Sequence, residues 1–288
     1  MIARSAVEPK AQSVAAPRRE MHCTACESVQ NCAVAINLAT AIDDFWAARL
    51  RGEYFPRAYY DRLAMDEAYR IQLALIDRRV AAGERHIGWK VGLTAKAIQE
   101  QFSYHQPLFA CILETQPSGH VFGATELIHP GIETELCMRL GRGLAGEVTL
   151  EQIRAAVDVI HPSFEIIETR GDPVNQMALV VTDNGQQRSV VIGAPARLAP
   201  NLDLAKVGAR VQINGAEVAT GLGSAVLGNP LNSIQWLAGK LVEFGRSLRP
   251  GDIVMTGSFV RQFPLHPGDA AVAEFSGIGR VEVDIAKA

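Results

Sequence analysis

The sequence predicts an α+β protein with a helical N-terminal portion and a long β-rich body that carries inserted helices. Three observations lead to this fold class. Apolar residues recur at helical spacing within residues 36–84, whereas residues 85–288 consist mainly of short runs rich in Val and Ile that Gly and Pro interrupt. In addition, Asn214 and Gly215 lie between two alternating runs, which is a strong signal for a β-hairpin.

Residues 1–35 are rich in Ala, Ser, Pro and Arg and show no sustained helical or strand period, so we expect a flexible N-terminal extension. Cys23, Cys26 and Cys32 form a C-x-x-C motif with a third cysteine nearby. No second Cys or His pair follows at zinc-finger spacing, and no strand precedes the motif as in a redox fold. The role of these cysteines stays open.

Helical signals begin with "INLATAIDDFWAARLRG", where Leu38, Ile42 and Phe45 follow near-helical spacing. The next segment, "DEAYRIQLALIDRRVAAG", opens on acids and closes on arginines and a glycine, an order that suits the helix dipole. Within the β-rich body, "TLEQIRAAVDVI" has Thr149 and Gln152 at capping-box spacing. We predict a second inserted helix at "NSIQWLAGKLVEFG".

The composition excludes several classes of partner. The net charge is only −3 and the Lys and Arg residues are scattered, so no basic stripe is available for nucleic acid or an anionic membrane. The longest apolar runs are shorter than the roughly 18 to 20 residues that a transmembrane helix needs. The chain has five cysteines, an odd count, and Cys111 and Cys137 lie in apolar strand-like runs. We therefore expect free thiols and a cytoplasmic protein.

The stretch "HPGIETELCMRL" places two glutamates inside an apolar run. Read as a strand, it projects Glu133 and Glu135 from the same face, with Cα atoms about 6.5 to 7 Å apart. Two carboxylates held this close repel each other unless a cation or a shared proton relieves them. A divalent ion such as magnesium, manganese or calcium suits these hard oxygen ligands. An ordinary solvent-facing strand remains the alternative for this motif taken alone.

Two further segments strengthen the metal interpretation. After Pro162 we expect another strand, in which Glu165 lies among apolar residues and needs a partner, while Glu168 falls on the opposite face. In "HIGWKVGLT", Lys90 shares its strand face with two glycines, which leaves open space around the ammonium for an anionic substrate group. A lysine on the exposed side of a half-buried strand is the alternative.

Read in order, the motifs resemble one known family. "IGWKVGLT", "HPGIETEL", "PSFEIIETR", "VTDNG", "TGLGSAVLGNPLNSIQWLA" and "LRPGDIVMTGSF" closely resemble the 2-oxopent-4-enoate hydratase and 4-oxalocrotonate decarboxylase family of the fumarylacetoacetase-like superfamily. The resemblance runs through residues 36–285. It implies a fumarylacetoacetase-like mixed β-roll, and we expect residues 36–288 to form a single catalytic domain, with a helical portion at 36–84 and a β-rich body at 85–288.

The resemblance also implies the site. Glu133, Glu135 and Glu165 match the family's ligands for Mg²⁺ or Mn²⁺, and Lys90 matches the lysine that contacts the substrate. Relatives act on 2-hydroxydienoates and their 2-oxo tautomers. The expected function is therefore metal-dependent hydration of a 2-oxopent-4-enoate or 2-oxohept-3-enedioate type substrate, with catalytic roles for these four residues.

Three positions complete the expected substrate site and leave the reaction open. Leu108 stands where many hydratases carry an aspartate, and decarboxylases of the family are apolar there. Gln186 replaces a serine of the family pattern. Arg261 is a candidate for binding a remote carboxylate. A 4-oxalocrotonate-type decarboxylase with the same metal site is the main alternative; acylpyruvate hydrolysis and a non-catalytic partner subunit are weaker ones.

The expected partners follow from the same reasoning. We expect a small-molecule 2-oxo or 2-hydroxy acid substrate and neither nucleic acid nor membrane. The resemblance implies a homo-oligomer, and complex formation with a pathway partner enzyme is left open.

Overall fold

The computed structural model describes residues 36–171 and 176–288, and Ile36–Ala288 form one compact unit. The predicted extension at 1–35, with Cys23, Cys26 and Cys32, lies outside the described residues. Within the described part of the chain, no helix has the length and apolar character needed to cross a membrane.

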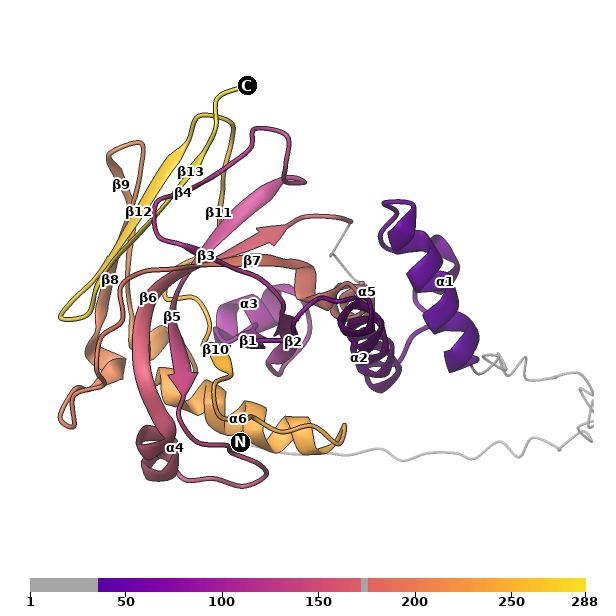
Figure 1. Ribbon diagram of the computed structural model, residues 1–288, viewed down its shortest axis with the longest axis horizontal. Helices are drawn as coiled ribbons and strands as arrows, with labels where there is room; N and C mark the ends of the chain where they lie inside the picture. Colours follow the sequence, from indigo (N-terminus) through magenta and orange to yellow (C-terminus); the bar gives the residue numbers. More distant parts are fainter. Residues whose placement is uncertain (1–35, 172–175) are drawn as a thin grey trace, which may run out of the picture. The chain divides into compact units, whose positions relative to one another are not determined.

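The described residues begin with the predicted helical portion. Helix α1 spans Leu38–Leu50, a short 3-10 helix η1 spans Arg57–Tyr59, and α2 spans Met65–Ala81. Helix α2 has acids in its first turn and arginines in its last, as the helix dipole favours. The two helices contact each other, and α2 also contacts the later helix α5 (Met177–Thr182), as Figure 1 shows.

The larger sheet has eight strands and carries the buried glutamates. Its order is β2-β1-β10-β5-β6-β7-β3, with β11 paired to β5. The bounds are β1 Gly88–Gly92, β2 Leu108–Ile112, β3 Thr115–Pro117, β5 Pro130–Leu140, β6 Val157–Glu168, β7 Gln187–Ile192, β10 Ile253–Met255 and β11 Phe263–Pro264. The central strands β5 and β6 pair in antiparallel fashion and are the two longest strands of this sheet.

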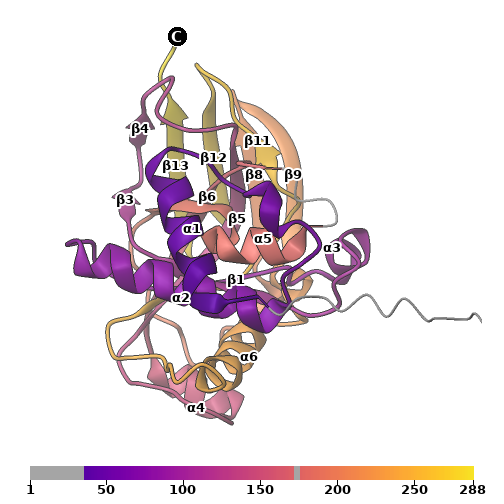
Figure 2. The same ribbon diagram turned by 90° about the vertical axis from the view of Figure 1, so that its right-hand side faces the viewer.

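The smaller sheet has five strands in the order β4-β13-β12-β8-β9. The bounds are β4 His120–Phe122, β8 Gly208–Ile213, β9 Ala216–Leu222, β12 Ala270–Phe275 and β13 Gly279–Ile285. Figures 1 and 2 show these strands side by side, and β12 and β13 contact β6 of the larger sheet. The hairpin predicted at Asn214 and Gly215 joins β8 to β9, and both residues have positive φ as the turn requires.

The β-rich body contains more helices than the two predicted. Helix α4 spans Leu150–Ala156 and α6 spans Pro230–Val242; the two lie together at the bottom of Figures 1 and 2. The sequence reading missed α3 (Lys96–Gln101) and α5, which are too short to show a helical period. Three further 3-10 turns are η2 Asn184–Gln186, η3 Leu204–Lys206 and η4 Gly223–Ala225. The mixed helix and strand content predicted from the sequence is confirmed.

One predicted boundary is wrong. The capping box of Thr149 and Gln152 is present, but α4 ends at Ala156, and the "VDVI" assigned to it already belongs to β6. Val159 and Ile160 pair with Arg139 and Met138 of β5. Because β-branched residues favour a paired strand, this long-range pairing overrides the helical pattern that the local sequence continues.

The core joins the helical portion to the larger sheet. Tyr69 of α2 stacks on Phe109 of β2 with ring centroids 4.3 Å apart, and Trp89 of β1 meets Phe109 edge-on. Gln72 of α2 is fully buried and donates hydrogen bonds to the carbonyls of Phe109 and Val181. Helix α2 therefore fixes both β2 and α5, two elements that border the candidate site.

Close packing of β1 on β10 leads to a stability prediction. A Cβ added at Gly88 would lie 2.0 Å from the carbonyl oxygen of Ile253, a backbone atom that cannot rotate away. We expect Gly88→Ala to lower the free energy of unfolding by at least about 2 kcal/mol in urea titrations. Gly239→Ala in α6 is the control: its Cβ would meet nothing within 4 Å, so a gain of up to about 1 kcal/mol is expected. Equal stabilities of the two variants would contradict the packing described here.

Candidate active site

Strands β5 and β6 bring three carboxylates to one place. Glu133 and Glu135 project from the same face of β5, and Glu165 of β6 lies directly opposite Glu133 in the ladder. Each residue offers a carboxylate oxygen, and these oxygens all lie within 4.8 Å of one another. The structure thus brings together the three glutamates that the sequence analysis selected as metal ligands.

The carboxylates lack the hydrogen bonds that buried anions normally have. Glu135 and Glu165 are fully buried, while Glu133 is partly exposed. The backbone N–H of Gly257 donates to Oε2 of Glu135 at 2.7 Å. Among the described residues, Oε1 of Glu135 and Oε2 of Glu165 accept no hydrogen bond, and Oε1 of Glu165 has only its ion pair with Lys90. Because orphaned buried carboxylate oxygens are costly, the donor set fits a hard divalent cation such as Mg²⁺ or Mn²⁺.

Burial and repulsion from neighbouring carboxylates both raise the pKa values of Glu135 and Glu165. Burial, followed by repulsion from Glu165 and Glu133, raises the pKa of Glu135 well above its usual value. Burial also raises the pKa of Glu165 to about 7, although the ammonium of Lys90 opposes this shift. The cluster therefore resists carrying three negative charges unless positive charge is placed beside it.

Lys90 of β1 supplies part of that positive charge. Its Nζ lies 3.2 Å from Oε1 of Glu165 and donates a hydrogen bond to the carbonyl of Gly185 at 3.0 Å. Burial alone would lower the pKa of Lys90, but the three glutamates outweigh this effect and raise it. The alternative of a lysine on the exposed side of a half-buried strand is wrong, because Lys90 is only 4% exposed. A Cβ at the flanking Gly92 would lie 3.6 Å from Nζ, which is an ordinary van der Waals contact.

A cavity of about 340 Å³ opens beside Lys90 and Glu133. All of the residues predicted to bind substrate line it: Lys90, Leu108, Gln186 and Arg261. Leu108 and Gln186 are buried in the wall, whereas Arg261 is exposed and its guanidinium lies 4.0 Å from the centre of the Phe263 ring. Glu135 and Glu165 are not part of the lining. The cavity therefore has an acidic and cationic end at Lys90 and Glu133 and a separate cation at Arg261.

Several lining residues were not selected from the sequence. Thr94, Phe102, Ser258 and Gln262 contribute to the wall, and α3 borders the cavity through Ile98 and Gln101. For Ser258 the sequence offered a signal, because a glycine precedes it in "TGSF". This residue, Gly257, has a φ of +110°, which bends the chain after β10 so that its N–H donates to Glu135. The hydroxyl of Ser258 then accepts a hydrogen bond from Thr134 N, which ties this bend to β5.

Comparison with known protein families identifies the class of protein to which this chain belongs. Residues 95–286 match the family described as Fumarylacetoacetate (FAA) hydrolase C-terminal, and the chain belongs to this family. The family membership predicted from the motifs is thereby confirmed.

Individual relatives with known names are similar to this chain over most of its length. A 2-keto-4-pentenoate hydratase of Paraburkholderia xenovorans (strain LB400) is 32% identical over 79% of this chain and 86% of that protein. A 4-oxalocrotonate decarboxylase of Pseudomonas sp. (strain CF600) is 31% identical over 76% of this chain and 84% of that protein. Among solved structures, 4-oxalocrotonate decarboxylase from Pseudomonas putida G7, complexed with magnesium and adipate, is 30% identical with a TM-score of 0.78, covering 86% of this chain and 95% of that one. The chain is an enzyme of this family.

The geometry of the carboxylates leads to a binding prediction. We expect Glu133→Gln to weaken Mg²⁺ binding by more than about tenfold in calorimetric titrations, since it removes one charged ligand. Without metal, the variant should unfold at the same or a higher temperature than the wild type, because one of three repelling charges is gone. Glu147→Gln is the control, since Glu147 is exposed and lies outside the cluster. Unchanged Mg²⁺ affinity in Glu133→Gln would exclude this residue as a ligand.

Proposed function

We propose that the protein is a divalent-metal-dependent lyase that hydrates a 2-hydroxydienoate or 2-oxoalkenoate of the 2-oxopent-4-enoate or 2-oxohept-3-enedioate type. The observation that carries the proposal is the convergence of Glu133, Glu135 and Glu165 beside Lys90, with Glu133 and Lys90 lining one end of the cavity. Names of relatives, which include several hydratases, agree with this assignment. The proposed framework is a fumarylacetoacetase-like mixed β-roll.

In this proposal the three glutamates hold Mg²⁺ or Mn²⁺, which when bound supplies Lewis-acid polarisation of a 2-oxo acid. Lys90 places a fixed ammonium beside the charge that develops on the substrate oxygen during tautomerisation, and its burial strengthens this interaction. Nε2 of Gln186 finds no hydrogen-bond partner among the described residues, so it is free to donate to a substrate oxygen. Leu108 and Phe102 provide an apolar wall that limits access of bulk water.

Decarboxylation in the manner of 4-oxalocrotonate decarboxylase is the second candidate. Leu108 favours it, since a leucine cannot move a proton to or from an attacking water, and loss of carbon dioxide needs an electron sink without that base. Arg261 also suits a substrate with a second carboxylate, as in the adipate complex of the related structure. Both reactions use the same metal ligands and the same Lys90.

We further propose that the enzyme acts in the cytoplasm as a homo-oligomer, and that association with a pathway partner enzyme is a further state to test. The buried free thiols of Cys111 and Cys137 agree with a reducing compartment.

The two reactions can be separated directly. Purified protein with MgCl₂ is incubated with 2-hydroxypenta-2,4-dienoate and, separately, with 2-oxohex-3-enedioate, while ultraviolet absorbance and released carbon dioxide are followed. Hydration is expected to consume the dienol and give a 4-hydroxy-2-oxo acid without gas. Gas release from the diacid with no hydroxylated product would replace hydration by decarboxylation, and no turnover of either substrate would reject the lyase proposal.

A second experiment tests the role of Arg261. We expect Arg261→Gln to lower kcat/KM for a dicarboxylate by about 10- to 100-fold, because a charge-assisted hydrogen bond to the remote carboxylate is lost. The value for a monocarboxylate should change less than about twofold, since that substrate has no group at this end. Arg142→Gln, at an exposed arginine outside the cavity lining, is the control. An equal loss with both substrates would show that Arg261 does not read the second carboxylate.

A further inference from the structure

A strained backbone segment lies beside the site. Asn184, Gly185 and Gln186 all have left-handed φ values, of 53°, 57° and 59°. Left-handed conformations are usually adopted by single residues, mostly Gly and sometimes Asn, because a side chain crowds the following carbonyl. A run of three that includes a glutamine persists only where the surroundings hold it. We call Asn184–Gln186 the left-handed turn.

Asn184 anchors this turn to β2. Its side-chain oxygen accepts a hydrogen bond from Cys111 N, and its side-chain nitrogen donates to Cys111 O, both at 2.8 Å. The Asn184 side chain thereby completes the backbone pairing of Cys111 as a neighbouring strand would. Asn184 is only 7% exposed, so both bonds are sheltered from water.

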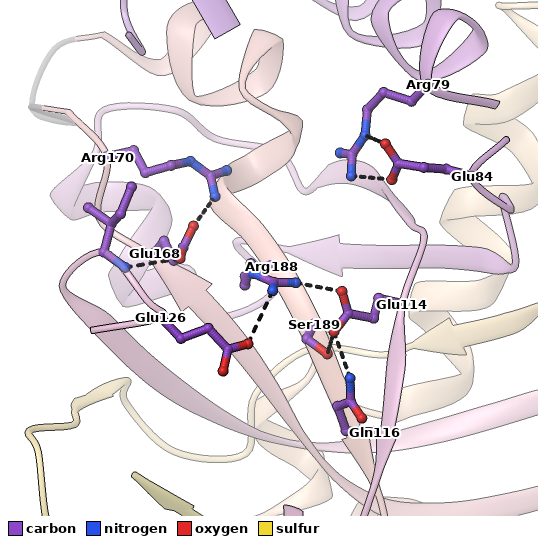
Figure 3. Close-up of polar contacts among 10 residues, drawn as sticks. Arg79, Glu84, Glu114, Gln116, Glu126, Glu168, Arg170, Arg188 and Ser189 are labelled. Carbon is purple, nitrogen blue, oxygen red and sulfur yellow. Dashed lines mark hydrogen bonds and ion pairs between the residues drawn. The ribbon is translucent and has the colours of Figure 1, made fainter. Parts of the chain in front are cut away.

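A buried ion-pair network holds the residue that precedes the turn. Nε of Arg170 pairs with Oδ2 of Asp183 at 2.8 Å, and Nη2 of Arg170 donates to Asp183 O at 3.1 Å. The same guanidinium pairs with Glu168 at 2.6 Å, as Figure 3 shows, and Glu168 also accepts a hydrogen bond from Ile128 N. Glu168 ends β6, the strand that carries Glu165. The network therefore links the turn to the strand that bears one of the metal ligands.

The left-handed turn contacts the side chain of Lys90. The carbonyl of Gly185 accepts a hydrogen bond from Nζ of Lys90, the same ammonium that pairs with Glu165. A Cβ at Gly185 would lie 2.9 Å from Cε of Lys90, so any larger residue here would displace the lysine side chain. The next residue, Gln186, lines the cavity. The left-handed turn thus places the carbonyl of Gly185 against the ammonium of Lys90 and the amide side chain of Gln186 in the cavity wall.

We propose that the left-handed turn is a positioning element that fixes the ammonium of Lys90 beside the carboxylate cluster, and that Asn184 is the positioning residue that holds it. Asn184 does not line the cavity and acts through Gly185. The consequence for turnover rests on the proposed lyase function, whereas the consequence for the place of Lys90 does not.

The chain contains a matched control for Asn184. Asn214 also has a φ of 53°, and its side chain also makes two hydrogen bonds, accepting from Ala270 N and donating to Asp269. Asn214 lies in the β8–β9 hairpin and does not line the cavity. Asn184→Ala and Asn214→Ala therefore remove the same groups from the same backbone conformation, but only Asn184→Ala releases the support of Lys90.

The test combines crystal structures with kinetics. In Asn184→Ala we expect Lys90 Nζ to leave Gly185 O, with kcat falling about 10- to 100-fold while Mg²⁺ affinity changes less than threefold. Asn214→Ala should keep the Lys90 contact and its kcat within about twofold of the wild type, and should lose less thermal stability because Asn214 is exposed. Asn184→Gly and Asn214→Gly provide a second pair that tolerates left-handed φ, in case the alanine variant does not fold.

The outcomes separate the two proposals. If Lys90 keeps its contacts with Gly185 and Glu165 in the folded Asn184 variants, the positioning role is wrong, whatever the activity. If the wild type turns over no 2-oxo acid but Lys90 moves in Asn184→Ala and not in Asn214→Ala, the positioning role stands and the lyase function falls.

Discussion

The constraint on which the site depends is the crowding of three carboxylates in a place with little water. Two of them are fully buried, and the described residues give them a single backbone donor, at Gly257. Such a cluster is unfavourable unless positive charge compensates it. Lys90 offers one charge, and the orphaned oxygens of Glu135 and Glu165 call for a further cation. The arrangement is thus unfavourable for the metal-free fold and favourable for binding a metal, as expected for a site selected for chemistry and not for stability.

The sequence predicted the local part of this arrangement and not its long-range part. Strict alternation in β5 was enough to place Glu133 and Glu135 on one face. That Glu165 faces Glu133 depends on the register of β5 against β6, and a slip of one residue would turn the cluster away. Alternation within either strand carries no information on that register. The start of β6 was misplaced for the same reason, because Val157 is held in the strand by its pairing with Leu140 of β5.

The left-handed turn also could not be predicted from the sequence. The run "DNGQ" contains one glycine, and nothing in the residue types announces three successive positive φ values. They are imposed by contacts from distant segments, chiefly Cys111 of β2 and Arg170 after β6. The short helices α3 and α5 were not predicted because six residues are too few to establish a helical period. The candidate substrate residues were found because a family resemblance supplied what periodicity could not.

The cavity shows why one fold can serve two reactions. In the proposed function, the glutamates and Lys90 act at the 2-oxo acid end of the substrate, which hydration and decarboxylation have in common. In the proposed function, Leu108 and Arg261 distinguish substrates and reactions, and both lie outside β1, β5 and β6, which carry Lys90 and the glutamates. A change at either position leaves the β5–β6 ladder and its carboxylates untouched. The reaction can therefore diverge while the fold and metal ligands persist, which is why membership of the family alone does not decide between hydratase and decarboxylase.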